Sequence, residues 1–312
     1  MSSRLILFNK VSAPLFMPEI IKKYEEPLAA GLYLTPTPIG CLEDISLRAL
    51  RVLQQAHLIA AEDTRVTGLL LRHYGIKAKT CRYDDHSHEK QGGYIRSLIR
   101  EGHAVALVSD AGMPGISDPG WQLLKDCRAE GLAVTVLPGA NAVLPGLLLS
   151  GLAPMPFVFG GFLPVKSGAR KEKILTLAKA EASLVFYESA RRILDLLTDA
   201  HAALGNRQAA LVREISKKFE EVQSGTIAEL MAMCQQSDSI IRGEYVVVID
   251  AKPAAGDEQP TDELAIKTRL ATLLIDHPPA KAARLVAAEF SLPRQHIYDL
   301  ALAMKVRHEN QA

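Results

Sequence analysis

The residues best suited to ligand chemistry in this chain lie between Ser109 and Gly120. Five of these twelve residues are Gly or Pro, and the apolar run Ala104–Val108 precedes them. The run predicts a parallel strand covered on both faces, so Asp110 would follow the carboxyl end of a strand, where α/β sheets place groups that contact ligands. The stretch therefore predicts a strand-to-helix ligand loop. A glycine-rich turn that binds nothing is the alternative.

The elements that would position this loop alternate between strand and helix. Apolar runs of strand length lie at Leu32–Thr35, Leu58–Ala61, Ala78–Arg82, Ala104–Val108 and Ala133–Leu137. In a parallel sheet their carboxyl ends meet at one edge. The polar segments brought to that edge would be Thr35–Gly40, Glu62–Arg65, Asp84–His88, Asp110–Met113 and Pro138–Ala142.

Short polar residues mark the expected starts of the helices, because their side-chain oxygens can accept hydrogen bonds from the first turn. The expected caps are Asp44, Thr64 and Asp118, with Pro119 in the first turn of the last helix. Gly75 and Gly131 mark expected helix ends.

Length and composition indicate two α/β domains with a small helical addition. With 312 residues, of which 48% are hydrophobic, the chain can bury two cores. The expected divisions are an extension at 1–30, α/β domains at 31–152 and 153–250, a linker at 251–261 and helices at 262–312. In the second domain, strands at 209–213 and 220–223 follow each other without a helix, which predicts a mixed sheet.

The C-terminal segment has the spacing of a helix-turn-helix. Helical patterns cover 262–275, 279–289 and 294–305. Residues 251–312 hold eight basic and eight acidic side chains, which weakens the interpretation as a nucleic-acid reader. Nucleic-acid recognition and simple packing both remain open.

General nucleotide and metal motifs are absent from the sequence. It has no Gly-Lys-Ser/Thr phosphate loop, no Gly-x-Gly-x-x-Gly fingerprint and no helical histidine pair, which disfavours nucleotide hydrolysis, hydride transfer and zinc hydrolysis. The four cysteines are widely spaced, so we expect free thiols and no metal. Apolar stretches fall short of a membrane span or signal core, which predicts no membrane association and a cytoplasmic location.

Seven motifs occur in order along the chain. They are Thr35-Pro36-Thr37-Pro38-Ile39-Gly40, Ala61-Glu62-Asp63-Thr64-Arg65, Val108–Pro114 with Ser117–Gly120, Leu137-Pro138-Gly139, Gly161-Phe162-Leu163-Pro164, Phe186-Tyr187-Glu188-Ser189 and Arg242-Gly243-Glu244-Tyr245. Together they resemble the tetrapyrrole methylase family of class III S-adenosylmethionine-dependent methyltransferases, in its branch that modifies small-subunit ribosomal RNA. The resemblance covers about residues 31–310.

The resemblance implies a homodimer of two-domain α/β chains that binds S-adenosyl-L-methionine in the cleft between domains. It also implies methyl transfer to the ribose 2′-oxygen of a cytidine in the decoding region of 16S rRNA, within the small ribosomal subunit. The cofactor-binding residues that it implies are Pro38, Asp110, Ala111, Gly112, Met113, Asn141, Ala142, Tyr187, Glu188, Glu214 and Glu244. For those of the second domain, ordinary strand-end residues are the alternative.

The chain departs from the family pattern near the expected cofactor. Met113 replaces the usual Thr of the Asp-Ala-Gly-Thr-Pro loop, Cys41 replaces an Asn, and Gly160 replaces a Glu. The turn after Leu137 reads Pro-Gly-Ala-Asn-Ala instead of Pro-Gly-Pro-Ser-Ala. Met113 can still contact the cofactor through its backbone and thioether, whereas Cys41 lacks the hydrogen bonds of an amide.

A ribose hydroxyl is a very weak acid, so a base near the attacking oxygen would assist transfer from a sulfonium, without a metal. The candidates are Glu62 and Asp63, with Arg65 ordering them or holding a phosphate. Alternatively, Asp63 and Thr64 cap a helix and Arg65 pairs with Glu62. His86 and His88 are a third option.

A net charge of +1 means that RNA would have to meet a local basic patch. Residues 162–220 hold eleven basic and seven acidic side chains, and Lys166, Arg170 and Lys171 are the expected RNA contacts. A solvated charged helix face is the alternative. Two other functions also stay open, namely methylation of a small tetrapyrrole and non-catalytic RNA binding.

Overall fold

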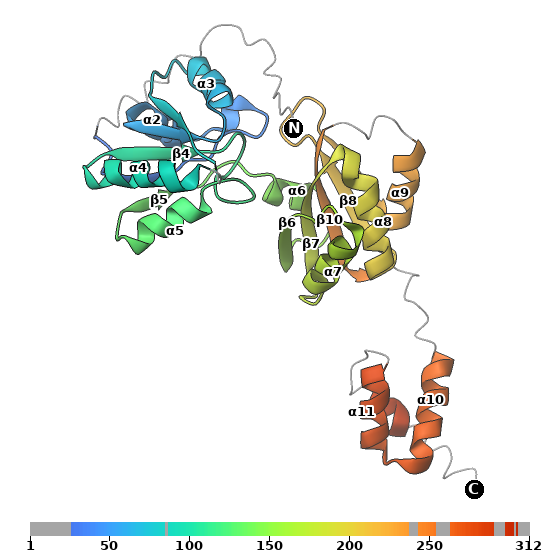
Figure 1. The fold of residues 1–312 in the computed structure, drawn as a ribbon. Coiled ribbons are helices and arrows are strands. Elements are labelled where there is room, and N and C mark those ends of the chain that lie inside the picture. Colours follow the sequence, from blue (N-terminus) through green and yellow to red (C-terminus); the bar gives the residue numbers. More distant parts are fainter. Residues whose placement is uncertain are drawn as a thin grey trace. The chain divides into compact units, whose positions relative to one another are not determined.

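The computed structural model describes residues 26–84, 87–236, 243–253, 263–289, 297–302 and 304. The chain forms two compact units, Met1–Lys252 and Pro253–Ala312. The larger unit contains two five-stranded sheets, and the smaller one is helical (Figure 1). Most of the expected N-terminal extension and of the expected linker lies outside the described residues.

The first sheet has the strand order β3-β2-β4-β1-β5. Its strands are β1 (Gly31–Leu34), β2 (Leu58–Ala61), β3 (Thr80–Arg82), β4 (Ala104–Val108) and β5 (Val134–Val136). Each neighbouring pair is parallel. The predicted parallel α/β sheet is therefore confirmed, and its carboxyl ends share one edge.

Helices cover both faces of this sheet (Figure 1). Successive strand residues point to opposite faces. Ile59 therefore joins the core beneath α2 (Leu47–Gln55) and α3 (Thr64–His73). Ala60 joins the core on the other face, beneath α4 (His88–Arg100) and α5 (Trp121–Ala129). The central strand β4 is buried along its whole length, which explains its uniformly apolar sequence.

The helix starts differ from the predicted ones. A short 3-10 turn, η1 (Leu42–Asp44), precedes α2, and Ser46 caps that helix by accepting a hydrogen bond from the Ala49 N–H. Asp63, not Thr64, caps α3. The α5 helix begins after Gly120, which occupies the N-cap position with a φ of 136°. Asp118 is therefore not the cap of this helix.

The second sheet has the order β6-β7-β10-β8-β9. Its strands are β6 (Phe157–Phe162), β7 (Ser183–Ser189), β8 (Arg207–Arg213), β9 (Glu221–Thr226) and β10 (Glu244–Pro253). The β6–β7 pair is parallel, whereas β7–β10 and β8–β9 are antiparallel. The prediction of a mixed sheet is confirmed.

One face of the second sheet is covered by α7 (Ser167–Ala178), α8 (Ile193–Leu204) and α9 (Ile227–Gln236), with the turn η2 (Ala190–Arg192) before α8. The other face packs against α6 (Val143–Leu149) and Ile39 from the first half of the unit. At Gly146 the contact is so close that an added Cβ would lie 2.7 Å from a Val246 methyl carbon. This apolar cluster joins the two halves.

The C-terminal unit is a small helical cluster. Its helices are α10 (Glu263–Asp276) and α11 (Pro279–Glu289), and residues 297–302 are also helical. They surround buried Leu270, Ala283, Val286 and Ile297. The three predicted helices are confirmed within the described residues, whereas the turn at 290–296 lies outside them.

Cys41, Cys81, Cys127 and Cys234 are free thiols, as predicted. Among the described residues, every helix falls short of the length or apolar character that crossing a membrane requires. Within the same residues, His, Cys, Asp and Glu form no group of three or more that could hold a metal ion.

Candidate active site

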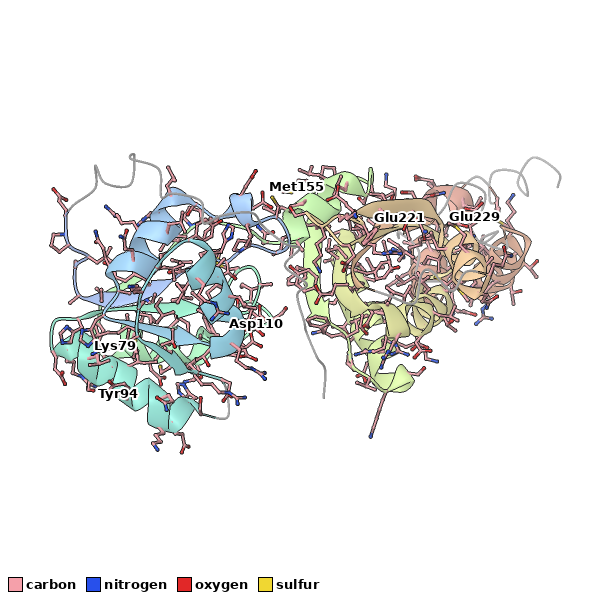
Figure 2. The ribbon with its side chains drawn as sticks, turned by 90° about the horizontal axis from the view of Figure 1, so that it is seen from above. Lys79, Tyr94, Asp110, Met155, Glu221 and Glu229 are labelled. Carbon is pink, nitrogen blue, oxygen red and sulfur yellow. The ribbon has the colours of Figure 1, made fainter. Side chains whose placement is uncertain are left out.

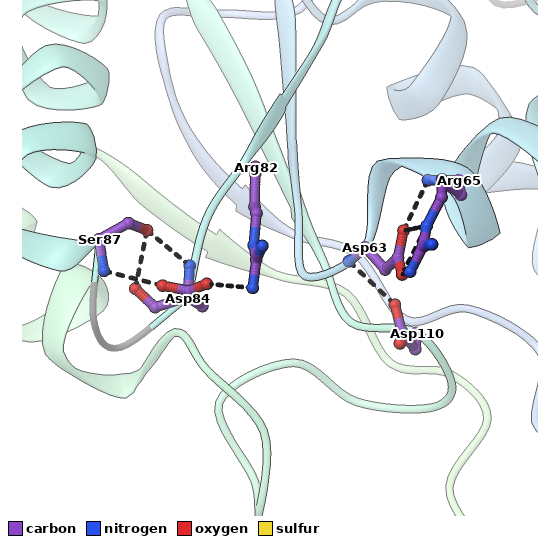
Figure 3. Close-up of polar contacts among 6 residues, drawn as sticks. All are labelled: Asp63, Arg65, Arg82, Asp84, Ser87 and Asp110. Atoms are coloured by element: carbon purple, nitrogen blue, oxygen red, sulfur yellow. Dashed lines mark hydrogen bonds and ion pairs between the residues drawn. The ribbon is translucent and has the colours of Figure 1, made fainter. Parts of the chain in front are cut away.

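Two strand ends are tied together at the carboxyl edge of the first sheet. Asp110 follows β4, and its Oδ1 accepts a hydrogen bond from the Asp63 N–H at 3.0 Å (Figure 3). In return, the Asp110 N–H donates to Glu62 Oε2 at 3.3 Å. Figure 2 places Asp110 at the far end of the sheet from Lys79, which precedes β3. These contacts tie the backbone after β2 to the backbone after β4 through the carboxylates of Asp110 and Glu62.

The Asp63 side chain caps α3 and binds Arg65. Its carboxylate accepts hydrogen bonds from the Arg65 N–H at 2.8 Å and from the Arg65 guanidinium at 2.6 Å and 3.0 Å. The hydrogen bonds from Arg65 lower the pKa of Asp63 to about 2. A carboxylate with so low a pKa is a weak base. The alternative pairing of Arg65 with Glu62 is wrong, because the guanidinium lies on Asp63.

The neighbouring strand β3 repeats this arrangement. Arg82 Nη2 lies 2.9 Å from Asp84 Oδ2, and Asp84 also accepts a hydrogen bond from the Ser87 N–H (Figure 3). Burial alone would raise the pKa of Asp84, but the hydrogen bonds from Ser87 and Arg82 outweigh it and lower that pKa. The Arg65 and Arg82 side chains are 89% and 73% exposed. The edge therefore carries two guanidinium groups that face solvent.

The loops after β1 and β4 pair with each other beside this edge. Thr37 and Gly112 exchange two backbone hydrogen bonds, of 3.0 Å and 2.9 Å. Gly112 has a φ of 82°, and an added Cβ would lie 3.3 Å from the Ile39 side chain, so the loop requires glycine there. A small pocket opens next to the pairing, lined by Thr37, Pro38, Gly40, Leu42, Val66, Thr67, Leu70, Ser109 and Asp110. Pro38 and Asp110 thus share one pocket, with Ala111, Gly112 and Met113 in the adjoining loop.

The start of α6 meets the second sheet at Tyr187. Asn141 Oδ1 accepts a hydrogen bond from the Leu144 N–H and so organises the first turn. Ala142, Val143 and Tyr187 pack in one apolar cluster; the backbone N–H groups of Ala142 and Val143 favour the ionised tyrosine, yet burial dominates and raises the pKa of Tyr187 to about 12. Asn141, Ala142 and Tyr187 therefore lie together at the junction of the two halves.

Glu188 points away from this junction, which corrects the expectation that it lines the same site as Tyr187. Successive strand residues face opposite sides, and Glu188 is only 2% exposed beneath the helices. Its Oε1 accepts a hydrogen bond from the Ser189 N–H, and Arg192 lies 3.2 Å from Oε2. Burial raises the pKa of Glu188 despite these groups.

Glu214 and Glu244 converge on one lysine. Lys217 Nζ lies 3.1 Å from Glu214 Oε1 and 3.1 Å from Glu244 Oε2. Burial of Lys217 favours the neutral amine, but the two carboxylates outweigh it and raise the pKa of Lys217. An added Cβ at Gly40 would lie 2.6 Å from Lys217 Cγ, so this cluster sits against the Pro38–Gly40 loop.

The three expected RNA contacts separate in the structure. Lys166 is exposed and Lys171 is half-buried, both at the start of α7. Arg170 is only 4% exposed, and its Nε donates to Asp199 Oδ2 at 2.6 Å. We therefore correct the assignment of Arg170, because its guanidinium is enclosed by protein.

The histidine option receives no support from the described residues. His86 lies outside them. His88 Nδ1 lies 2.8 Å from the buried Tyr83 hydroxyl, and its Nε2 lies 3.1 Å from Asp126. These contacts join His88, the first residue of α4, to Asp126 of α5, so it is not a solvated loop residue.

Sequence reasoning missed Lys217, Arg192 and Arg82. Arg192 could have been found from its spacing of four residues from Glu188, which suits an ion pair. Lys217 similarly follows Glu214 by three residues. The predicted parallel sheet already brought the strand end at Arg82 to the same edge as Arg65, but no motif singled Arg82 out, and its position beside Arg65 arises from the pairing of β2 with β3.

Comparison with known proteins identifies the family and the fold of this chain. Residues 31–231 match the family described as Tetrapyrrole (Corrin/Porphyrin) Methylases, and residues 260–305 match the RsmI C-terminal HTH domain. Among solved structures, the chain resembles cobalt precorrin-4 methyltransferase, with a TM-score of 0.54 and 18% identity over 71% of this chain and 96% of that one. It also resembles diphthine synthase, with a TM-score of 0.56 and 14% identity over 70% and 89%. These structural likenesses define the fold.

Sequence relatives are more specific. The chain is 41% identical to ribosomal RNA small subunit methyltransferase I of Haemophilus influenzae, over 88% of this chain and 98% of that protein. It is 43% identical to the protein of the same name from Vibrio cholerae, over 87% and 94%. The chain therefore belongs to the tetrapyrrole methylases, a methyltransferase family, and within them to the group of the ribosomal RNA small subunit methyltransferase I proteins.

Proposed function

We propose that this protein transfers the methyl group of S-adenosyl-L-methionine to the ribose 2′-oxygen of a cytidine in the decoding region of 16S rRNA. The relatives' names support a small-subunit rRNA substrate. The observation that carries the chemistry is the pair of hydrogen bonds that join Asp110 to Glu62 and Asp63, next to the pocket that Pro38 lines. It puts carboxylates beside the loop that would hold the methyl donor.

The residues present fit this cofactor. Gly112, with a φ of 82° and with Ile39 and the Ala140 carbonyl close by, keeps the backbone of this loop in a tight turn directly after Asp110 and Ala111. Asp110, Ala111, Gly112 and Met113 would hold the methionine end, with a carboxylate suited to its positive charges. Asn141, Ala142 and Tyr187 would contact the other end. When bound, S-adenosylmethionine supplies an electrophilic methyl group on a sulfonium.

The protein's own task is to orient the ribose oxygen and to relieve it of its proton. Glu62 is the better base, because among the described residues its carboxylate receives a single long backbone hydrogen bond of 3.3 Å, whereas Asp63 is held by Arg65. Asp63 and Arg65 then become positioning residues, which fix the turn that presents Glu62. The exposed side of Arg65 remains suited to an RNA phosphate.

Transfer of a labelled methyl group tests the proposal. The full-length protein is incubated with labelled S-adenosylmethionine and, separately, small ribosomal subunits, free 16S rRNA or a porphyrinoid precursor. We expect label in RNA, followed by alkali-resistant dinucleotides, because a 2′-O-methyl group blocks cleavage at its own phosphodiester. Label in the porphyrinoid, alkali-sensitive label in RNA, or no transfer above a blank without protein would each reject the proposal.

The proposal also includes a homodimer. It further includes a cytoplasmic location, which follows from a ribosomal substrate. Support for the dimer comes from α6, where Leu144, Leu148 and Leu149 are 50%, 71% and 40% exposed. An apolar helix face of this kind suits burial against another chain. Light scattering on the full-length protein should give twice the chain mass, and a concentration-independent monomer would refute the dimer.

A further inference from the structure

The loop Leu163–Lys166 is fastened from the inside by two arginines. Arg170 Nη1 donates to the carbonyls of Pro164 and Val165 at 3.4 Å and 3.3 Å. Arg192 Nη2 donates to the carbonyls of Leu163 and Pro164 at 2.8 Å and 3.3 Å. These four contacts fix the backbone of the loop.

Both arginines are held in turn by buried acids. Asp199 is 6% exposed and accepts from Arg170 Nε at 2.6 Å, while its other oxygen accepts from the Ser167 hydroxyl. Glu188 faces Arg192 from the end of β7. Because both guanidinium groups are held by acids and already bond the loop carbonyls, the loop is ordered before any partner arrives.

The fastened loop presents a half-exposed aromatic ring. Phe162 ends β6 with 46% of its surface exposed, and its ring meets that of Tyr187 at 5.6 Å and 60°. Tyr187 also contacts Phe159 and packs in the apolar cluster that includes Ala142 and Val143 at the start of α6. The Phe162 ring is thus supported on one side and open on the other.

The backbone that carries this ring passes beside the loop expected to hold the methyl donor. An added Cβ on Gly161, the residue before Phe162, would lie 3.3 Å from Ser117 Oγ, which belongs to the Ser109–Gly120 loop. On the other side, exposed Lys166 and Lys173 and half-buried Lys171 follow in sequence. An open aromatic face followed within a few residues by exposed cationic side chains matches a nucleotide, whose base stacks and whose phosphate is negative.

We infer that Phe162 and Lys166 form a nucleotide subsite, in which the Phe162 ring stacks on an unpaired base of the RNA and Lys166 contacts a phosphate. The inference rests on the proposed RNA substrate and assigns a stacking residue to it. Arg170 and Arg192 are positioning residues of this subsite. Their guanidinium groups bind the loop carbonyls, and we assign no RNA contact to them.

Binding of RNA tests the subsite without relying on catalysis. The probe is a fluorescent single-stranded RNA of the decoding-region sequence, and the full-length protein carries Phe162→Ala, Phe162→Tyr or Phe219→Ala. Phe219 is the matched control, because it is a 64% exposed phenylalanine of the same half. We expect Phe162→Ala to weaken binding about 5-fold to 100-fold, the loss of one base stack, with Phe162→Tyr and Phe219→Ala within about 2-fold of wild type.

The salt dependence of the same binding tests Lys166. Lys166→Ala should reduce the slope of log K against log salt by about 0.7, the value for one phosphate of a single strand, whereas Lys179→Ala at the far end of α7 should not. Equal losses for Phe162→Ala and Phe219→Ala, or an unchanged slope for Lys166→Ala, would overturn the inference.

Calorimetry with S-adenosylmethionine separates this subsite from the cofactor site. The affinity of Phe162→Ala for the cofactor should match that of wild type, and a loss equal to the loss in RNA binding would overturn the inference, because the ring would then act through Tyr187. If wild type binds the RNA as expected but transfers no methyl group, the proposed function fails while the subsite stands. If wild type does not bind the RNA, the subsite fails.

Discussion

Glu62 and Asp63 are adjacent carboxylates with different surroundings. Arg65 binds the Asp63 carboxylate and lowers its pKa to about 2, while the Glu62 carboxylate accepts, within the part of the chain that the structure describes, one hydrogen bond, from the Asp110 N–H. Replacing Glu62 by Gln should therefore lower kcat about 100-fold to 10,000-fold, the usual contribution of a general base, whereas Asp63→Asn should lower it less than about 10-fold. Single-turnover methyl transfer measures both. Equal losses in the two variants would contradict the assignment of roles.

Asp63 should also contribute stability that depends on pH. Its pKa falls from 3.8 in the unfolded chain to about 2 in the folded one, so its contribution is present above pH 3.8 and is lost as pH falls toward 2. Asp63→Ala removes a helix cap and should cost about 1 kcal/mol at neutral pH. Urea unfolding over a pH series should show this difference shrinking below pH 3.8. A difference that stays constant would show that the carboxylate charge is unimportant.

At the scale of elements, the Arg170–Asp199 pair fixes α7 to α8. Both side chains are buried, so Arg170→Met should lower the free energy of unfolding by about 3–5 kcal/mol by leaving Asp199 unpaired. The double variant with Asp199→Leu should recover most of that loss, because no buried charge remains. Urea unfolding measures both. An Arg170→Met protein of full stability would instead favour an exposed RNA contact.

The packing of α6 on β10 makes a second prediction. Gly146→Ala would push a Cβ to within 2.7 Å of Val246 and should destabilise the protein by about 1–3 kcal/mol through overpacking. Gly168→Ala in α7 is the control, since an added Cβ there meets nothing within 4 Å and should stabilise the helix by up to about 1 kcal/mol. Thermal unfolding that ranks the two variants in the opposite order would contradict the packing.

These elements could be predicted to different depths. The buried strand at Ala104–Val108 and its neighbours follow from apolar periodicity, and their parallel order follows from the alternation with helices. Helix caps could not be predicted as well, because the choice between Asp63 and Thr64 depends on which residue adopts extended backbone. Arg170 looked like an exposed cation because its partner, Asp199, lies 29 residues away.

At the scale of the whole Met1–Lys252 unit, the residues that we propose to bind the cofactor divide between the two halves. Asp110 and Gly112 belong to the first sheet, and Tyr187 reaches the start of α6 from the second. The cluster of Glu214, Lys217 and Glu244 meets the Gly40 loop in the same way. A ligand bound at this junction would need both halves. Neither sheet alone supplies the complete set.

The central claim is that the Asp110 loop and Tyr187 hold one methyl donor jointly. Calorimetry with S-adenosylmethionine tests it most directly, on wild type, Asp110→Asn, Tyr187→Phe and the exposed control Asp195→Asn. We predict saturable heat for wild type, a dissociation constant raised about 10-fold to 100-fold by Asp110→Asn and about 2-fold to 10-fold by Tyr187→Phe, and no change for the control. No heat with wild type, or affinities unchanged in both site variants, would contradict the claim.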